Sequence, residues 1–71
     1  DYLLVLARHT PNMVDYRTLV TEAQGYQAEA REAKELTKWH IHHIRQALED
    51  DKNNPTLIIN LRNSGYRLVV N

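Results

Sequence analysis

The N-terminal third of the chain carries apolar residues at helical spacing. Within residues 1–9 the apolar positions 2, 3, 6 and 7 fall on one face of a helix. Pro11 ends that pattern, because proline cannot continue the backbone hydrogen-bond ladder. Asp15 is suited to cap a second helix, and Gly25 suits the left-handed position after its end. The apolar stripe of this second helix consists of Tyr16, Leu19, Val20 and Ala23.

One long helix is predicted over residues 29–49. No glycine or proline interrupts this segment, which is rich in Ala, Glu, Lys, Leu and Arg. Its core-facing positions are spaced 4, 4, 3 and 4 residues apart, as expected for an amphipathic helix. These positions are Ala33, Thr37, Ile41, Ile44 and Leu48.

The C-terminal part of the chain predicts a β-hairpin. A polar loop over 50–55 precedes strand-like segments over 57–61 and 66–70, with turn chemistry at Asn63-Ser64-Gly65. Gly65 is the residue expected to allow a positive φ in this turn. Two short helices, a longer helix and a hairpin follow the order of a helix-turn-helix with a wing. The fold class is therefore predicted as α+β, mostly α.

Composition narrows the possible functions. The 71 residues make one small domain, and the absence of cysteine excludes disulfides and thiol chemistry. Nine basic and nine acidic residues cancel, so a nucleic-acid interface would depend on how the cations are distributed. No apolar run approaches the roughly 18 residues of a membrane span. Because the chain starts without methionine, inside the apolar run 2–7 and with no cap before it, we interpret it as a fragment of a longer protein.

The segment 38–46, KWHIHHIRQ, concentrates the candidate chemistry. His40 and His43 stand at i, i+3 and could chelate a divalent ion, but no third ligand stands at a recognisable spacing, so no metal site is predicted. Catalysis would need a nucleophile, an orienting partner and a pocket, and none is predicted. The segment is then either a solvated helix face or a face that contacts a partner.

Two residues of this segment keep alternatives open. Trp39 lies on the side away from the core, where a large aromatic side chain needs a partner. That partner is either the preceding loop, residues 26–28, or a ligand. His40 lies beside the core stripe, so its ring is expected either to be buried or to reach a phosphate.

The segments 40–49, HIHHIRQALE, and 57–68, LIINLRNSGYRL, resemble the winged-helix effector domain of OmpR/PhoB-type response regulators. That family shows V-H-I-x-x-L-R in its recognition helix and T-V-R-G-x-G-Y-R-L in its wing. The segment 4–11, LVLARHTP, resembles the family's first helix and its exit. This sequence departs from the family at His42 and His43, which replace two basic residues, and it lacks the four-stranded sheet that precedes the first helix.

The resemblance implies the function of the chain. Residues 1–71 would form the DNA-binding output domain of a bacterial, cytoplasmic two-component response regulator, with no cofactor and no enzyme activity. The recognition helix, about 29–49, would enter the major groove, the wing 57–70 would support it, and two domains would bind neighbouring half-sites. RNA polymerase and a receiver domain would be partners of the full-length protein. The alternative is a winged-helix protein-interaction module without DNA binding.

The resemblance and the helical positions together assign the DNA contacts. Residues expected to meet base edges are Lys38, Trp39, His42, His43 and Gln46. Residues expected near phosphates are Lys34, His40 and Arg45. Arg62 is expected at the minor groove or its phosphate edge, with a plain strand-surface role for Arg62 and Arg67 as the alternative. Tyr66 is expected to pack under the wing with its hydroxyl near a phosphate.

Overall fold

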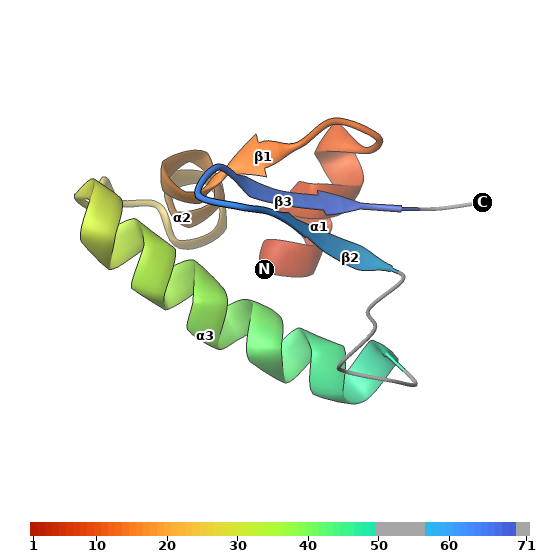
Figure 1. The fold of residues 1–71 in the computed structure, drawn as a ribbon. Helices are drawn as coiled ribbons and strands as arrows, with labels where there is room; N and C mark the ends of the chain where they lie inside the picture. Colours follow the sequence, from red (N-terminus) through yellow and green to blue (C-terminus); the bar gives the residue numbers. More distant parts are fainter. Residues whose placement is uncertain (50–56, 70–71) are drawn as a thin grey trace.

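Three helices and a three-stranded antiparallel sheet make up the fold in the computed structural model, which describes residues 1–49 and 57–69 (Figure 1). The predicted winged helix-turn-helix is confirmed, with the hairpin β2–β3 as the wing. The predicted loop 50–55 and the end of the predicted second wing strand, Val70, lie outside the described residues. The elements are α1 (Tyr2–His9), β1 (Val14–Asp15), α2 (Tyr16–Gln24), α3 (Ala30–Leu48), β2 (Ile58–Leu61) and β3 (Gly65–Leu68).

Short-range capping fixes the ends of the first two helices. The Asp15 carboxylate accepts a hydrogen bond of 2.7 Å from the Thr18 amide, and bonding to Thr18 lowers the pKa of Asp15. Gly25 takes φ 79° and donates its N–H to the Thr21 carbonyl, as predicted for the end of α2. The expectation that α1 lacks a cap was wrong, because the Asp1 carboxylate accepts from the amides of Leu3 and Leu4 at 2.9 and 3.4 Å.

The core lies between the three helices and the sheet. On α3 the predicted stripe is buried at Ala33, Thr37 and Ile41 and partly buried at Ile44. The prediction for Leu48 was wrong, since this side chain is 43% exposed. Helix α3 is longer than the layer of α1 and α2 on which it packs, and its last turn extends past them (Figure 1). The buried apolar residues are Tyr2, Val5, Leu6, Val14, Leu19, Val20, Ala28, Ala33, Ile41, Ile58 and Tyr66.

The sheet contains one strand that the sequence did not predict. Its order is β1-β3-β2, and Val14 and Asp15 of β1 pair with Tyr66 and Gly65 of β3. With only two residues, β1 is too short to show the alternation that marks a strand. Strand β1 pairs with β3 of the wing, and its residue Val14 packs in the core. The wing is therefore joined to the body of the domain through the sheet.

The turn of the wing also differs from the prediction. Asn63, with φ 59°, is the residue with positive φ, and Gly65 lies in β3. Asparagine tolerates the left-handed region better than most residues with a side chain. Glycine is required at 65 for another reason: a Cβ there would lie 2.0 Å from the Val14 carbonyl oxygen. Gly65 therefore allows the close approach of β1 to β3.

The end of α3 protects the open edge of β2. The Glu49 carboxylate accepts hydrogen bonds from the amides of Leu57 at 3.1 Å and Ile58 at 3.0 Å. Arg45 Nη2 donates to the Ile58 carbonyl at 2.8 Å. An acid at a helix C-terminus is unfavourable for the helix dipole, but here it satisfies strand amides that would otherwise lose their partners. Two side chains of α3 thus attach the wing to the helix.

Candidate nucleic-acid interface

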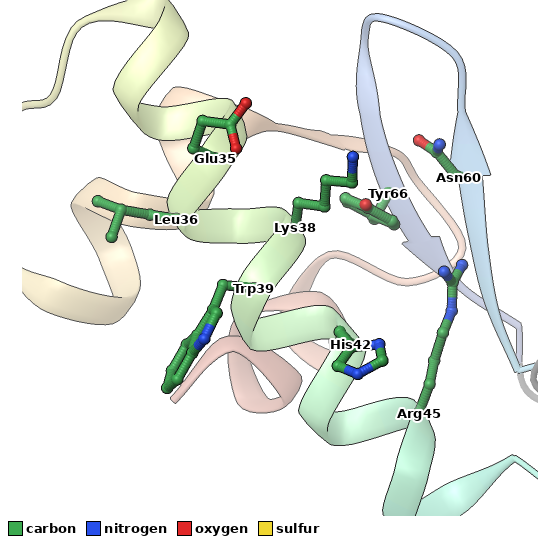
Figure 2. Close-up of a pocket in the computed structure, with 8 residues that line it drawn as sticks. All are labelled: Glu35, Leu36, Lys38, Trp39, His42, Arg45, Asn60 and Tyr66. Carbon is green, nitrogen blue, oxygen red and sulfur yellow. The ribbon is translucent and has the colours of Figure 1, made fainter.

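A groove of about 930 Å³ separates the exposed face of α3 from the wing. Figure 2 shows Lys38 extending from α3 toward the Tyr66 hydroxyl and Asn60, with His42 one turn further along the helix. We call this surface the α3–wing groove. Its lining residues are Glu35, Leu36, Lys38, Trp39, His42, Arg45, Asn60 and Tyr66.

A second hollow, of about 370 Å³, adjoins this groove near the turn of the wing. Lys34 and Lys38 reach it from α3, and Arg62 reaches it from the wing. Lys34 Nζ donates to Asn63 Oδ1 at 3.0 Å, which links the helix to the turn. The structure therefore brings three of the predicted cations together at the junction of α3 and the wing.

Trp39 is 60% exposed on α3. Its ring lies edge-on to the rings of His40 and His43, with centroid distances of 4.9 and 4.3 Å. The preceding loop does not bury it, and Figure 2 shows the indole directed away from the wing. Because the two neighbouring imidazoles limit the positions of the ring, Trp39 presents a fixed apolar surface beside the α3–wing groove.

His40 is partly buried between α1 and α3. Its ring stacks on Tyr2 with centroids 4.3 Å apart and an angle of 16° between the rings. The Tyr2 hydroxyl in turn donates to Gln24 Oε1 at 2.7 Å. Burial lowers the pKa of His40, and the charges of His43 and of the chain N-terminus add to the effect. The neutral ring is therefore favoured, and it joins α1 to α3.

Arg45, expected near phosphates, is only partly exposed and reaches the sheet. Besides its bond to the Ile58 carbonyl, its guanidinium carbon lies 5.6 Å from the centroid of the Tyr66 ring. Its Nε is buried and has no hydrogen-bond partner among residues 1–49 and 57–69. The long side chain reaches around the helix to the sheet, where it positions the wing.

Tyr66 packs under the wing, as predicted, with 5% of its surface exposed. Its ring meets Tyr16 edge-on at a centroid distance of 5.9 Å. Burial raises the pKa of the Tyr66 hydroxyl, although the charge of Arg45 opposes this shift. The hydroxyl is therefore protonated at neutral pH and able to donate a hydrogen bond.

The remaining candidates are exposed on α3. His42, His43 and Gln46 all lie on its solvent side, and Gln46 Nε2 lies 3.0 Å from His42 Nε2. Sequence reasoning missed Asn60, which lines both the groove and the adjoining hollow. Its signal is the single polar position between the apolar residues Ile59 and Leu61 of β2.

Two other kinds of site are absent from the described part of the chain. Among residues 1–49 and 57–69, no three His, Asp or Glu side chains gather as metal ligands would. None of the helices that these residues form is long and apolar enough to cross a membrane.

Comparison with known proteins identifies the family. The family described as "Transcriptional regulatory protein, C terminal" matches residues 1–68. A curated relative, the "Probable transcriptional regulator ycf27" of Porphyridium aerugineum, is 41% identical over 49 residues, which cover 69% of this chain. The match spans only 20% of that relative's length. The chain therefore belongs to the family of C-terminal domains of transcriptional regulatory proteins, the winged-helix domains of OmpR/PhoB-type regulators.

Proposed function

We propose that this domain binds double-stranded DNA by sequence, with α3 in the major groove and the wing at the adjacent minor groove. The observation that carries the proposal is the exposed face of α3. Lys38, Trp39, His42, His43 and Gln46 are all exposed there, whereas Ala33, Thr37 and Ile41 on the opposite face of the same helix are buried. The major groove, about 12 Å wide, admits one helix.

The exposed side chains have the chemistry that base edges require. Lys38 and Gln46 offer hydrogen-bond donors, and the apolar indole of Trp39 suits the methyl group of thymine. Arg62, exposed on the turn of the wing, supplies a positive charge to the minor groove or its phosphate edge. Arg45 and His40 hold the wing and α1 against the helix instead, since both rest on protein partners.

The domain is proposed to work as one part of a longer regulator. Its named relative is a transcriptional regulator about five times as long as the matched segment, which covers 20% of it. We propose that residues 1–71 are the output domain of a cytoplasmic response regulator, controlled by a separate receiver domain. Two copies on neighbouring half-sites would then present DNA-bound protein to RNA polymerase.

Replacing Arg62 by alanine should weaken DNA binding by about 1–3 kcal/mol and leave the fold intact, because the side chain is exposed on the turn. Fluorescence anisotropy with a duplex selected from a random pool measures the affinity. Arg67→Ala is the matched control, since Arg67 is an exposed cation of the same hairpin that lines neither hollow. Equal losses for both variants would make Arg62 an ordinary surface charge.

DNA affinity should rise as the pH falls from 8 to 6. His42 and His43 stand where the family carries permanent cations, and histidine is the type of side chain whose charge changes between about pH 5 and 8. Phosphates favour the charged imidazole, so DNA binding takes up protons. The gain in DNA affinity is therefore present at low pH and is lost as the pH rises. His40 does not share this role, because its ring stacks on Tyr2 and burial lowers its pKa.

The matched variants separate charge from shape. His42→Gln/His43→Gln should flatten the pH profile, whereas His42→Arg/His43→Arg should raise the affinity at pH 8. Anisotropy titrations at fixed ionic strength provide both curves. If the glutamine pair keeps the pH profile of the unmodified domain, the two histidines do not face the DNA.

A further inference from the structure

We propose that the hollow between α3 and the turn of the wing is a seat for a single backbone phosphate of the DNA, held jointly by Lys34, Lys38 and Arg62. We call it the phosphate seat. The inference rests on the proposed function, because the phosphate is part of the bound duplex. It adds the particular group of the DNA that this hollow accepts and the side chains that hold it, and it assigns Lys38 to that phosphate rather than to a base edge.

The geometry of the seat brings its cations from two elements to one point. Lys34 and Lys38 stand one helical turn apart on the same side of α3, and Arg62 approaches from the wing. The bond of 3.0 Å from Lys34 Nζ to Asn63 Oδ1 uses one of the three donors of the ammonium group. Two donors of Lys34 therefore remain for an anion. The lining residues are Tyr16, Lys34, Lys38, Asn60, Arg62, Asn63 and Tyr66.

The charged side chains that line the seat are all positive. Among the residues that the structure describes, no carboxylate lines the seat, although the whole sequence has as many acidic as basic side chains, nine of each. Glu35 lines the adjoining α3–wing groove, which shares Lys38 with the seat, but Glu35 does not line the seat itself. The remaining polar groups include the Asn60 amide and the protonated hydroxyl of Tyr66, both of which can donate to an oxyanion.

The position of the seat fits the path of a DNA strand. When a helix lies in the major groove and a wing lies at the neighbouring minor groove, a sugar-phosphate backbone runs between the two elements. The seat lies between α3 and the wing, so that backbone must pass it. A phosphodiester has one negative charge and two free oxygens, which match lysine ammonium groups acting as point charges and an arginine fork.

A neutral-phosphate scan tests the seat directly. A selected duplex is prepared with a methylphosphonate, which carries no charge, at one backbone position at a time. The 71-residue domain and its Lys34→Gln/Lys38→Gln variant are titrated with each duplex by anisotropy. For the unmodified domain, one position should lower the affinity about tenfold through lost charge-assisted bonds. The variant should bind the unmodified duplex correspondingly less well, and it should lose clearly less than about tenfold at that position, where Arg62 alone still contacts the phosphate.

The salt dependence provides a second readout. Each neutralised phosphate contributes about 0.9 to the slope of log affinity against log salt. Because both lysines serve one phosphate that Arg62 also contacts, the double variant should reduce the slope by no more than about 1. A reduction of about 2 would mean two separate phosphates and would contradict the shared seat. Arg8→Gln on α1 is the matched control, since Arg8 is exposed and lines neither hollow; it should leave the phosphate scan unchanged.

The outcomes separate this inference from the proposed function. If the duplex binds but every neutral position costs the variant as much as the unmodified domain, the seat is wrong and DNA binding stands. If no duplex binds at low salt, both are wrong. Inorganic phosphate at matched ionic strength tests the other source of the same anion. Displacement of Asn60 and Tyr66 NMR signals at submillimolar inorganic phosphate would assign the hollow to free phosphate and overturn its assignment to the DNA backbone.

Discussion

Replacing Gly65 by alanine should destabilise the domain by about 3 kcal/mol or more, which is a large part of the folding free energy of a chain this small. The added Cβ would lie 2.0 Å from the Val14 carbonyl oxygen and 2.7 Å from the Met13 sulfur. The methionine sulfur can move, but the carbonyl belongs to the backbone of β1. Strand β1 must therefore separate from β3, and DNA binding should fall with the displaced wing.

Gly25→Ala is the matched control for Gly65→Ala. Gly25 takes φ 79°, but an added Cβ would meet nothing within 4 Å. Only the cost of the left-handed conformation then applies, about 1–2 kcal/mol. Urea denaturation followed by circular dichroism measures both variants. A Gly65→Ala domain as stable as Gly25→Ala would show that β1 does not pack against β3 as described.

Replacing Glu49 by alanine should destabilise the domain by about 2 kcal/mol. The change removes the carboxylate that accepts from the amides of Leu57 and Ile58 at the start of β2. The Ile58 side chain is fully buried, so water cannot easily replace the lost acceptor at its amide. Hydrogen exchange of the β2 amides should accelerate together with the loss of stability.

Glu49→Gln keeps an acceptor oxygen and removes only the charge, so it should cost less than the alanine variant. The comparison of the two variants isolates the hydrogen bonds from the electrostatic effect. If alanine and glutamine destabilise equally, the acceptor oxygen is not what holds β2. If alanine has no effect on urea stability, the edge of β2 is not held by Glu49 at all.

The helices were predictable because their signals are local. Asp15 and Gly25 stand where capping chemistry requires them, and the apolar stripe of α3 has a clear helical period. The segments 40–49 and 57–68 resemble the recognition helix and wing of the OmpR/PhoB-type family. Because both patterns occur together at the family's separation, they predicted the winged-helix fold. The caps and the apolar stripe can each be read from a short local window, whereas the resemblance needs the segments 40–49 and 57–68 together.

The features that the sequence did not predict depend on contacts between residues that are distant in the chain. Strand β1 exists because Val14 meets Tyr66 across the chain, and Gly65 is required by Val14 rather than by its own turn. Arg45 looked like a solvent-facing cation, but its length allows it to reach the Ile58 carbonyl. The stacking of Tyr2 on His40 likewise depends on how α1 crosses α3. The helical period of the apolar residues does not show which distant residues come into contact.

The candidate site was predicted in part. The structure groups Lys34, Lys38 and Arg62, which the sequence could name but could not place together. Position on the helix separates these lysines from Trp39, which Figure 2 shows directed away from the wing.

Trp39 permits the most direct test, because it is the single tryptophan of the sequence and lies 60% exposed on α3. Titration of the domain with selected duplex DNA at low salt should shift and quench its fluorescence to saturation, since the indole becomes covered in the major groove. Added salt should reverse the change, as for an interface that depends on phosphate contacts. Duplex binding by anisotropy with unchanged Trp39 fluorescence would contradict the placement of α3 in the groove.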